Sequence, residues 1–105
     1  MQNNNSSSRV YGSKKYTNKR INSLTETVRS SLITYSRSRK NRVVTVDDVH
    51  SVLNNLRVGQ RETEVRLALT NRVFNDPTFR QTGKTVASRR PAAKYRRVNE
   101  WAVSR

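Results

Sequence analysis

The 105-residue chain contains no cysteine, one histidine, three glycines and two prolines. The absence of cysteine excludes disulfides, thiolate zinc sites and cysteine nucleophiles, and it fits a cytoplasmic location. No run of about 18 apolar residues is present that could span a membrane. The start of the chain, MQNNNSSSRV, also lacks the apolar segment of a signal peptide. We therefore expect a cytoplasmic protein with no membrane partner.

Acidic residues are also scarce. Seven Asp and Glu residues stand against 22 Lys and Arg residues, so the net charge is +15. A compact chain with this charge repels itself unless a polyanion neutralises it, and nucleic acid is the most obvious polyanion. The length allows one domain with a small core. The composition therefore favours a single-domain protein that binds nucleic acid.

Groups suited to catalysis are few. His50 lies close to Asp47 and Asp48 in the run VDDVHSVLNNL. This grouping could indicate a metal site or an acid–base pair, but two acids in the first turn of a helix also complement the helix dipole, and we prefer this second interpretation. The remaining acids are scattered singly, and no glycine-rich phosphate loop is present. We expect a binding protein with no enzymatic activity, no cofactor and no metal.

The N-terminal segment 1–19 is rich in Asn, Ser, Lys and Arg and shows no apolar periodicity. This is the composition of a disordered basic arm, and residues 20–105 form the predicted folded domain. Tyr11 and Tyr16 lie among the basic residues of the arm and could stack on bases, although solvated tail residues are the more frequent case. Whether the arm contacts DNA or a protein is left open.

Apolar spacing predicts two helices in the first half of the folded domain. The first covers Arg20 to Ser36, and its apolar side is formed by Ile21, Leu24, Val28, Leu32 and Tyr35. Val43 and Val44 predict a short strand. Thr45, followed three residues later by Asp48, resembles the capping box at the start of a helix, and Gly59 marks the break after this second helix.

A third helix is expected from about Glu62 to Asn75, with Thr63 as its N-cap and the Asp76-Pro77 pair as its end. Its inner face is formed by Val65, Ala68, Leu69 and Val73. Leu67 and Phe74 lie away from this face. We expect them to pack on the segment that follows.

Residues 80–105, RQTGKTVASRRPAAKYRRVNEWAVSR, hold eight Lys and Arg residues and one acid. They could form a solvated tail, but the Val and Trp content favours a β-hairpin. TFRQ is expected to be extended, Gly83 to provide a turn, Thr85 to Ser88 to return as a strand, and Arg97 to Val103 to form the last strand. The polar, proline-containing segment SRRPAAKYR is expected to form a projecting loop. Trp101 is expected to be a structural residue and not a base reader.

Three helices, with a short strand before the second and a basic hairpin after the third, follow the order of a winged helix, an α+β fold. The run VTVDDVHSVLNNL, a helix ending in NRVF, then FRQTG, the SRRP loop and R-x-V-x-x-W together resemble a group of small phage and prophage winged-helix DNA-binding proteins. The resemblance covers roughly residues 42–103. The chain departs from the usual pattern at Leu69-Thr70-Asn71, where a glycine often lies within the helix.

The resemblance implies a third helix in the major groove and a C-terminal wing along the backbone or the minor groove. The DNA-binding candidates are then Thr63, Arg66, Thr70, Asn71 and Arg72 on the helix, and Arg89, Arg90, Lys94, Arg96 and Arg97 on the wing. Arg66 would bond to guanine and Asn71 to adenine, while Arg89 or Arg90 would enter a narrow minor groove. A generic phosphate contact is the simpler role for each.

These features lead to one main hypothesis and two alternatives. The chain is predicted to bind double-stranded DNA as a phage or mobile-element protein in the host cytoplasm or nucleoid. Its role would be that of a regulator, a replication or partition accessory, or an excisionase-like architectural factor. The first alternative binds single-stranded DNA or RNA and stacks bases on Tyr11, Tyr16, Tyr95 and Trp101. The second is a basic module that inhibits an acidic host protein. The target sequence stays open, as does the choice between a monomer, a homodimer and a cooperative array on DNA.

Overall fold

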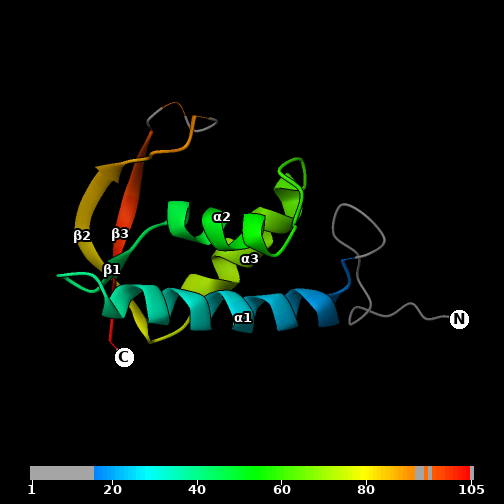
Figure 1. The fold of residues 1–105 in the computed structure, drawn as a ribbon, viewed down its shortest axis with the longest axis horizontal. Helices are drawn as coiled ribbons and strands as arrows, with labels where there is room; N and C mark the ends of the chain where they lie inside the picture. The colour runs from blue at the N-terminus through cyan, green and yellow to red at the C-terminus, as the bar shows by residue number, and fades with distance from the viewer. Residues whose placement is uncertain (1–15, 92–93, 95, 105) are drawn as a thin grey trace, which may run out of the picture.

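The computed structural model describes residues 16–91, 94 and 96–104, so Tyr11 and Tyr95 lie outside the described residues. The elements in chain order are α1 (Asn18–Arg37), β1 (Val43–Val44), α2 (Val46–Asn55), α3 (Thr63–Phe74), β2 (Phe79–Ala87) and β3 (Arg97–Val103). The strands form one antiparallel sheet in the order β1-β3-β2, which stands at one end of the helices (Figure 1). The protein is therefore α+β, with three helices and a three-stranded sheet among the described residues, an arrangement compatible with a winged helix.

The folded part begins before residue 20. Thr17 caps α1, because its Oγ1 accepts a hydrogen bond from the backbone N–H of Arg20 at 3.3 Å. Tyr16 is only 2 % exposed and belongs to the hydrophobic core. The prediction that Tyr16 belongs to a disordered arm is therefore wrong, since its ring fills core volume beside α1. The rest of the predicted arm, residues 1–15, lies outside the described residues.

The predicted capping box at the start of α2 is confirmed. Thr45 Oγ1 accepts from the backbone N–H of Asp47 at 3.2 Å, and the Thr45 N–H donates to Asp48 Oδ2 at 2.8 Å. Asp48 also accepts two hydrogen bonds of 2.8 Å from the Arg39 guanidinium, and these bonds raise the pKa of Arg39. Asp48 thus fixes both the start of α2 and the turn that follows α1.

The third helix begins at Thr63, which is its first residue and not its cap as predicted. Glu62 holds the cap position without a side-chain hydrogen bond. The predicted inner face is confirmed for the three residues that are fully buried, Val65, Leu69 and Val73. Leu67, by contrast, is 63 % exposed, so the expectation that it packs on the following segment is wrong.

The strand β2 is continuous through Gly83, where the sequence predicted a turn between two strands. Pairing with β3 runs from Phe79 opposite Val103 to Ala87 opposite Arg97, with a shift of register between Gln81 and Thr85. Gly83 lies inside this shift with φ of 87°, a conformation that glycine adopts without strain. The glycine is therefore absorbed as a bulge, and one long hairpin results.

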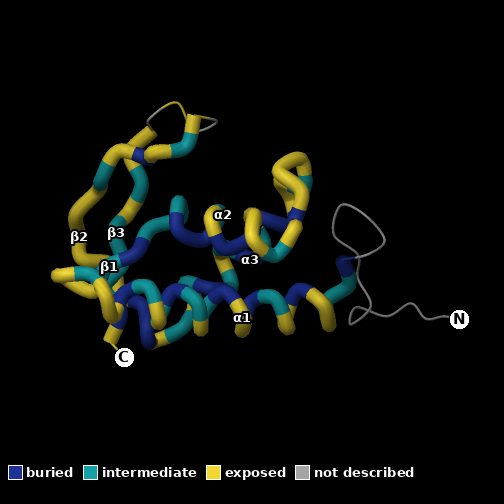
Figure 2. Tube along the Cα trace, in the orientation of Figure 1, coloured by how far each residue is buried: buried dark blue, intermediate teal, exposed yellow. Residues whose placement is uncertain are grey.

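Aromatic rings join α3 to the sheet. Phe74 at the end of α3 stacks on Trp101 with ring centroids 4.5 Å apart and an angle of 7° between the planes. Phe74 also meets Phe79 edge to face at 5.6 Å. Both contacts agree with the expectation that Trp101 is structural and that Phe74 packs on the segment after α3. Figure 2 shows that the buried residues lie mainly where the three helices face one another and at β1, while most of the hairpin is exposed.

Candidate nucleic-acid interface

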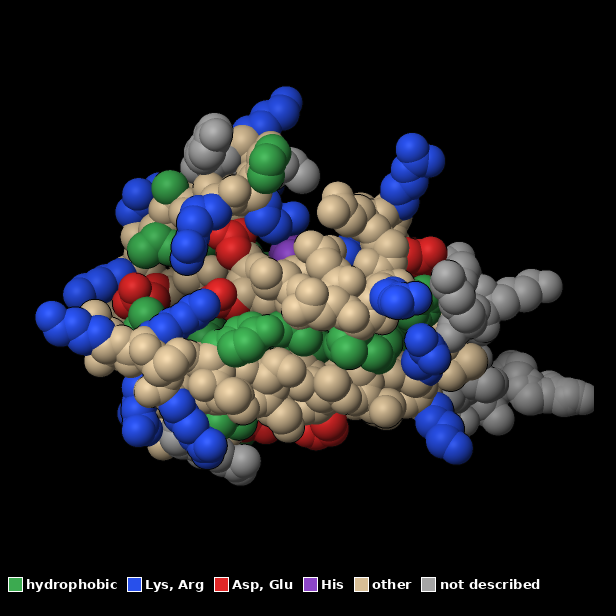
Figure 3. All heavy atoms as spheres, viewed as in Figure 1, with side chains coloured by type: hydrophobic (Ala, Val, Ile, Leu, Met, Phe, Trp, Pro, Cys, Tyr) green, Lys and Arg blue, Asp and Glu red, His purple; other side chains and the backbone are tan. Residues whose placement is uncertain are grey.

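The β2–β3 hairpin and its loop carry seven Lys and Arg residues in their described part. The exposed cations are Arg80, Lys84, Arg89, Lys94, Arg96 and Arg97, and Arg90 is half-buried. Glu100 is the one acidic residue in the described part of the hairpin and its loop. Lys and Arg side chains surround the loop end of the hairpin (Figure 3). This end of the molecule therefore offers a positive surface on a projecting element.

Asp47, in the first turn of α2, holds the beginning of the hairpin loop. Its Oδ1 accepts hydrogen bonds from Ser88 Oγ at 2.6 Å and Arg90 Nε at 3.3 Å, and its Oδ2 accepts from the Arg89 N–H at 2.8 Å. Burial raises the pKa of Asp47, but the hydrogen bonds from Ser88, Arg89 and Arg90 outweigh burial and leave this pKa below its ordinary value of 3.8. The loop is thus tied to α2 by a carboxylate that is charged at neutral pH.

Replacing Asp47 with Asn is expected to loosen this attachment. Asn keeps one oxygen acceptor and loses the charge, and a lost hydrogen bond to a charged group costs about 1.5–3 kcal/mol. Because the pKa of Asp47 is lowered in the folded state, the stability that its carboxylate contributes is fully present above its ordinary pKa. This stability is lost as the pH falls through the lowered pKa. The NMR shift of the Arg89 amide proton should therefore stay constant from about pH 7 to about pH 4 and move only below that range.

The Asp47→Asn variant should lack this movement, whereas Glu64→Gln, which removes an exposed acid of α3, should retain it. An Arg89 amide shift that is the same in the wild type and in Asp47→Asn across the whole range would show that the carboxylate does not hold the loop.

The structure contradicts the expectation that Arg66 reads guanine. Arg66 is 5 % exposed. Its guanidinium donates to Gly59 O at 3.0 Å, His50 Nδ1 at 2.8 Å, Asn54 Oδ1 at 2.7 Å and Val58 O at 2.6 Å. Four of the five N–H groups of an arginine side chain are therefore used inside the protein. Arg66 closes the connection between α2 and α3 and is not available to a base edge.

The other predicted residues of α3 are placed in different ways. Arg72 is half-buried, and its Nη1 donates to Asn22 Oδ1 on α1, so its side chain bridges α3 and α1 at the surface. Thr70 is half-buried, and its hydroxyl donates to the backbone carbonyl four residues earlier at 2.8 Å. The exposed residues of α3 are Thr63, Glu64, Leu67 and Asn71. The helix predicted to enter the major groove thus has no exposed cation.

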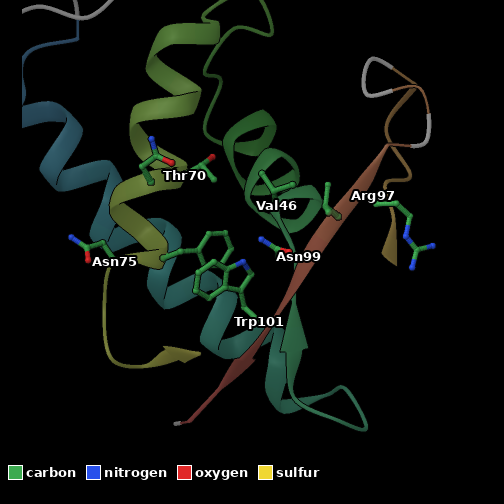
Figure 4. Close-up of a pocket in the computed structure, with 9 residues that line it drawn as sticks. Val46, Thr70, Asn75, Arg97, Asn99 and Trp101 are labelled. Carbon is green, nitrogen blue, oxygen red and sulfur yellow. The ribbon is translucent and has the colours of Figure 1, made fainter. Parts of the chain in front are cut away.

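A hollow of about 520 Å³ separates the second half of α3 from β3. Thr70 and Asn71 line it from α3, Asn75 from the end of that helix, and Asn99 and Trp101 from β3. Arg97 also lines this hollow, but Figure 4 shows its guanidinium directed away from it, and this group donates to the carbonyl of Thr85 at 2.6 Å. The groups directed toward this hollow are therefore neutral hydrogen-bonding groups.

A second hollow, of about 860 Å³, lies between α2, α3 and the start of the hairpin loop. It adjoins the first, because Val46 and Thr70 line both. Its polar lining consists of His50, Asn54, Gln60, Thr63, Arg66, Thr70 and Arg90. The imidazole is visible beside Lys or Arg side chains where the surface is hollowed between the hairpin loop and the helices (Figure 3). Burial, together with the positive charges of Arg90 and Arg66, lowers the pKa of His50 to about 4 against a smaller opposing effect of Asp47.

Comparison of the chain with protein-family models, with curated proteins and with solved structures finds no match. The resemblance to phage winged-helix proteins stays a prediction. Among the described residues, no helix is long and apolar enough to cross a membrane. Within the same residues, no three His, Cys, Asp or Glu side chains are grouped closely enough to hold a metal ion. The function is therefore inferred from the charge and geometry of the described residues.

Several residues of this surface were not found by sequence analysis. Arg80 and Lys84 add cations to the outer part of β2, and Asn99 adds an amide beside Trp101. The run RQTGKT contains no apolar residue, and this was the signal that Arg80 and Lys84 are exposed. Asp47 was assigned to the helix dipole alone, although the nearby excess of cations in SRRP was a reason to expect that an acid would pair with them.

Proposed function

We propose that the chain binds double-stranded DNA through a winged-helix arrangement in which the β2–β3 hairpin is the wing. The observation that carries this proposal is the group of exposed cations on the hairpin, which projects beyond three helices from a sheet of order β1-β3-β2. DNA carries one negative charge per about 1.7 Å of helix axis, so neutralising phosphates supplies much of the affinity of such proteins. The wing therefore provides the main contact with the backbone.

The helix α3 contributes differently in this proposal. Its exposed residues, Thr63 and Asn71 among them, are neutral or acidic. Asn can pair with adenine, and Thr can contact any base edge or the thymine methyl group. We infer that α3 supplies base readout with little electrostatic attraction, while the wing supplies affinity with little base readout.

Binding of single strands is less well supported, because that alternative relied on aromatic platforms. Tyr16 is buried in the core, and one face of Trp101 is covered by Phe74. Two of the four proposed platforms are thus used inside the protein. Tyr11 and Tyr95, the other two, lie outside the described residues.

The division between helix and wing can be tested with two single substitutions. Asn71→Ala should cost about 1–3 kcal/mol on a preferred duplex and little on random duplex DNA. Arg96→Ala should weaken both duplexes by similar factors, because a phosphate contact carries no sequence information. Fluorescence anisotropy with both duplexes measures the two effects. If Arg96→Ala alone lost discrimination, the wing would be the reading element and the assignment of α3 would be wrong.

The proposal itself is tested by competition. Labelled duplex DNA, single-stranded DNA of the same sequence and an acidic protein mixture are offered together to the immobilised full chain. Retention of the duplex in preference to the other two supports the proposal. Preferential retention of the single strand or of an acidic protein would overturn it in favour of one of the two alternatives.

A further inference from the structure

Among the described residues, the buried guanidinium of Arg66 has no negatively charged partner. All four of its acceptors are neutral, namely two backbone carbonyls, an amide oxygen and an imidazole nitrogen. No carboxylate oxygen lies within 4.0 Å of it among the described residues. Buried charges in proteins are normally paired, because an unpaired one is costly to remove from water. An uncompensated positive charge at the base of a hollow therefore indicates that the hollow binds an anion.

Arg90 adds a second cation to the same hollow. Its Nε contacts Asp47 at 3.3 Å, which leaves its two Nη groups without a hydrogen-bond partner among the described residues. The side chain is 33 % exposed, so these groups are accessible from solvent. Thr63 and Gln60, which are both exposed, add a hydroxyl and an amide to the lining. None of the residues that line the hollow is acidic.

We propose that the hollow between α2, α3 and the hairpin loop binds a phosphate group, with Arg90, Thr63 and Gln60 as donors and Arg66 as the charge beneath it. Two oxygens of one phosphate can accept two parallel N–H bonds from an arginine guanidinium, whereas a carbonyl group offers only one oxygen. In the DNA complex this phosphate is one backbone phosphate of the strand that passes between α3 and the hairpin. The source of the phosphate rests on the proposed function, whereas the site itself rests only on the charge and geometry of this chain.

The only histidine of the chain provides the test. His50 lines the hollow and faces Arg66 from α3, Arg90 from the loop and Asp47 from its own helix. A phosphate bound there favours the imidazolium form. The single imidazole signal in an NMR titration between about pH 4 and pH 8 should therefore show a His50 pKa that rises by about one unit or more when the site is filled. The full chain is titrated alone, with inorganic phosphate, with duplex DNA and with an acidic peptide.

A matched pair of variants locates the effect. Arg89 and Arg90 are neighbours, but only Arg90 lines the hollow. Arg90→Gln raises the pKa of His50 in the free protein because a cation is removed, so the quantity compared is the further rise caused by DNA. At saturating DNA, we expect this rise to be at least halved in Arg90→Gln. Arg89→Gln removes a wing cation and should weaken the affinity for DNA, but it should leave the rise at saturation unchanged. Anisotropy measured on the same samples reports DNA binding independently.

The outcomes separate this site from the proposed function. A rise in the His50 pKa with duplex DNA, reduced in Arg90→Gln, supports the site. A rise with inorganic phosphate but no DNA binding supports the site as a receptor for free phosphate and rejects the proposed function. DNA binding that leaves the His50 signal unchanged overturns the site and leaves the proposed function intact. A response to an acidic peptide, with none to DNA or phosphate, also overturns it.

Discussion

Replacing Arg66 with methionine is expected to lower the free energy of unfolding by about 3 kcal/mol or more. Methionine has a similar length and a similar helix propensity, so the main change is the loss of four hydrogen bonds to the connection between α2 and α3. Each buried acceptor that is left unsatisfied costs about 1–3 kcal/mol. Asn54 and Gly59 are exposed, so water can replace the bonds that their oxygens lose, and His50 and Val58 account for most of the expected loss.

Thermal unfolding followed by circular dichroism measures this effect. For a domain of this size, the melting temperature should fall by roughly 12 °C or more. Arg61→Met is the control, because it removes an exposed cation from the same connection and should change stability by at most about 0.5 kcal/mol. If Arg66→Met melted like the parent and lost only its preference for one DNA sequence, Arg66 would be the base reader that the sequence predicted.

The affinity for duplex DNA is expected to fall by roughly three to four orders of magnitude between 50 and 200 mM salt. About six to eight cations of the exposed set should meet phosphates, which gives a slope of log K against log salt of roughly −5 to −7. The hairpin alone offers six exposed cations and the half-buried Arg90. Titrations by fluorescence anisotropy at several salt concentrations give the slope directly.

Two variants make the salt measurement specific. Arg89→Ala removes an exposed wing cation and should make the slope shallower by about one. Asn71→Ala removes a neutral group of α3 and should leave the slope unchanged. A slope shallower than about −2 in the parent would contradict the assignment of the hairpin as a phosphate-binding wing.

Much of the fold could be predicted from the sequence because its signals are local. The spacing of Val65, Leu69 and Val73 places them on one side of a helix whatever surrounds it, and all three are fully buried. The capping box of Thr45 and Asp48 needs only a four-residue segment. The position of Trp101 at the end of an alternating run was enough to predict a strand after the basic loop.

Local signals failed where distant segments decide the outcome. Tyr16 belongs to a polar, basic stretch, and only the core beside α1 makes it a buried residue. Gly83 can adopt a positive φ in a turn as readily as in a bulge. A bulge forms here because β3 is long enough to pair with β2 on both sides of Gly83. In both cases the residue type was compatible with two structures.

For the candidate site, the sequence alone determined that the hairpin is basic and that Thr63 and Asn71 belong to two different polar sectors of α3. Only the tertiary structure decided the roles of Arg66 and Asp47. Arg66 is bound by groups from α2 up to 16 residues away, and Asp47 by a loop that starts 41 residues later. Helical periodicity gives the direction of a side chain, but a long polar side chain at the edge of the buried face can turn inward or outward. Which of the two directions the side chain takes depends on whether another element brings acceptors or donors within hydrogen-bond distance.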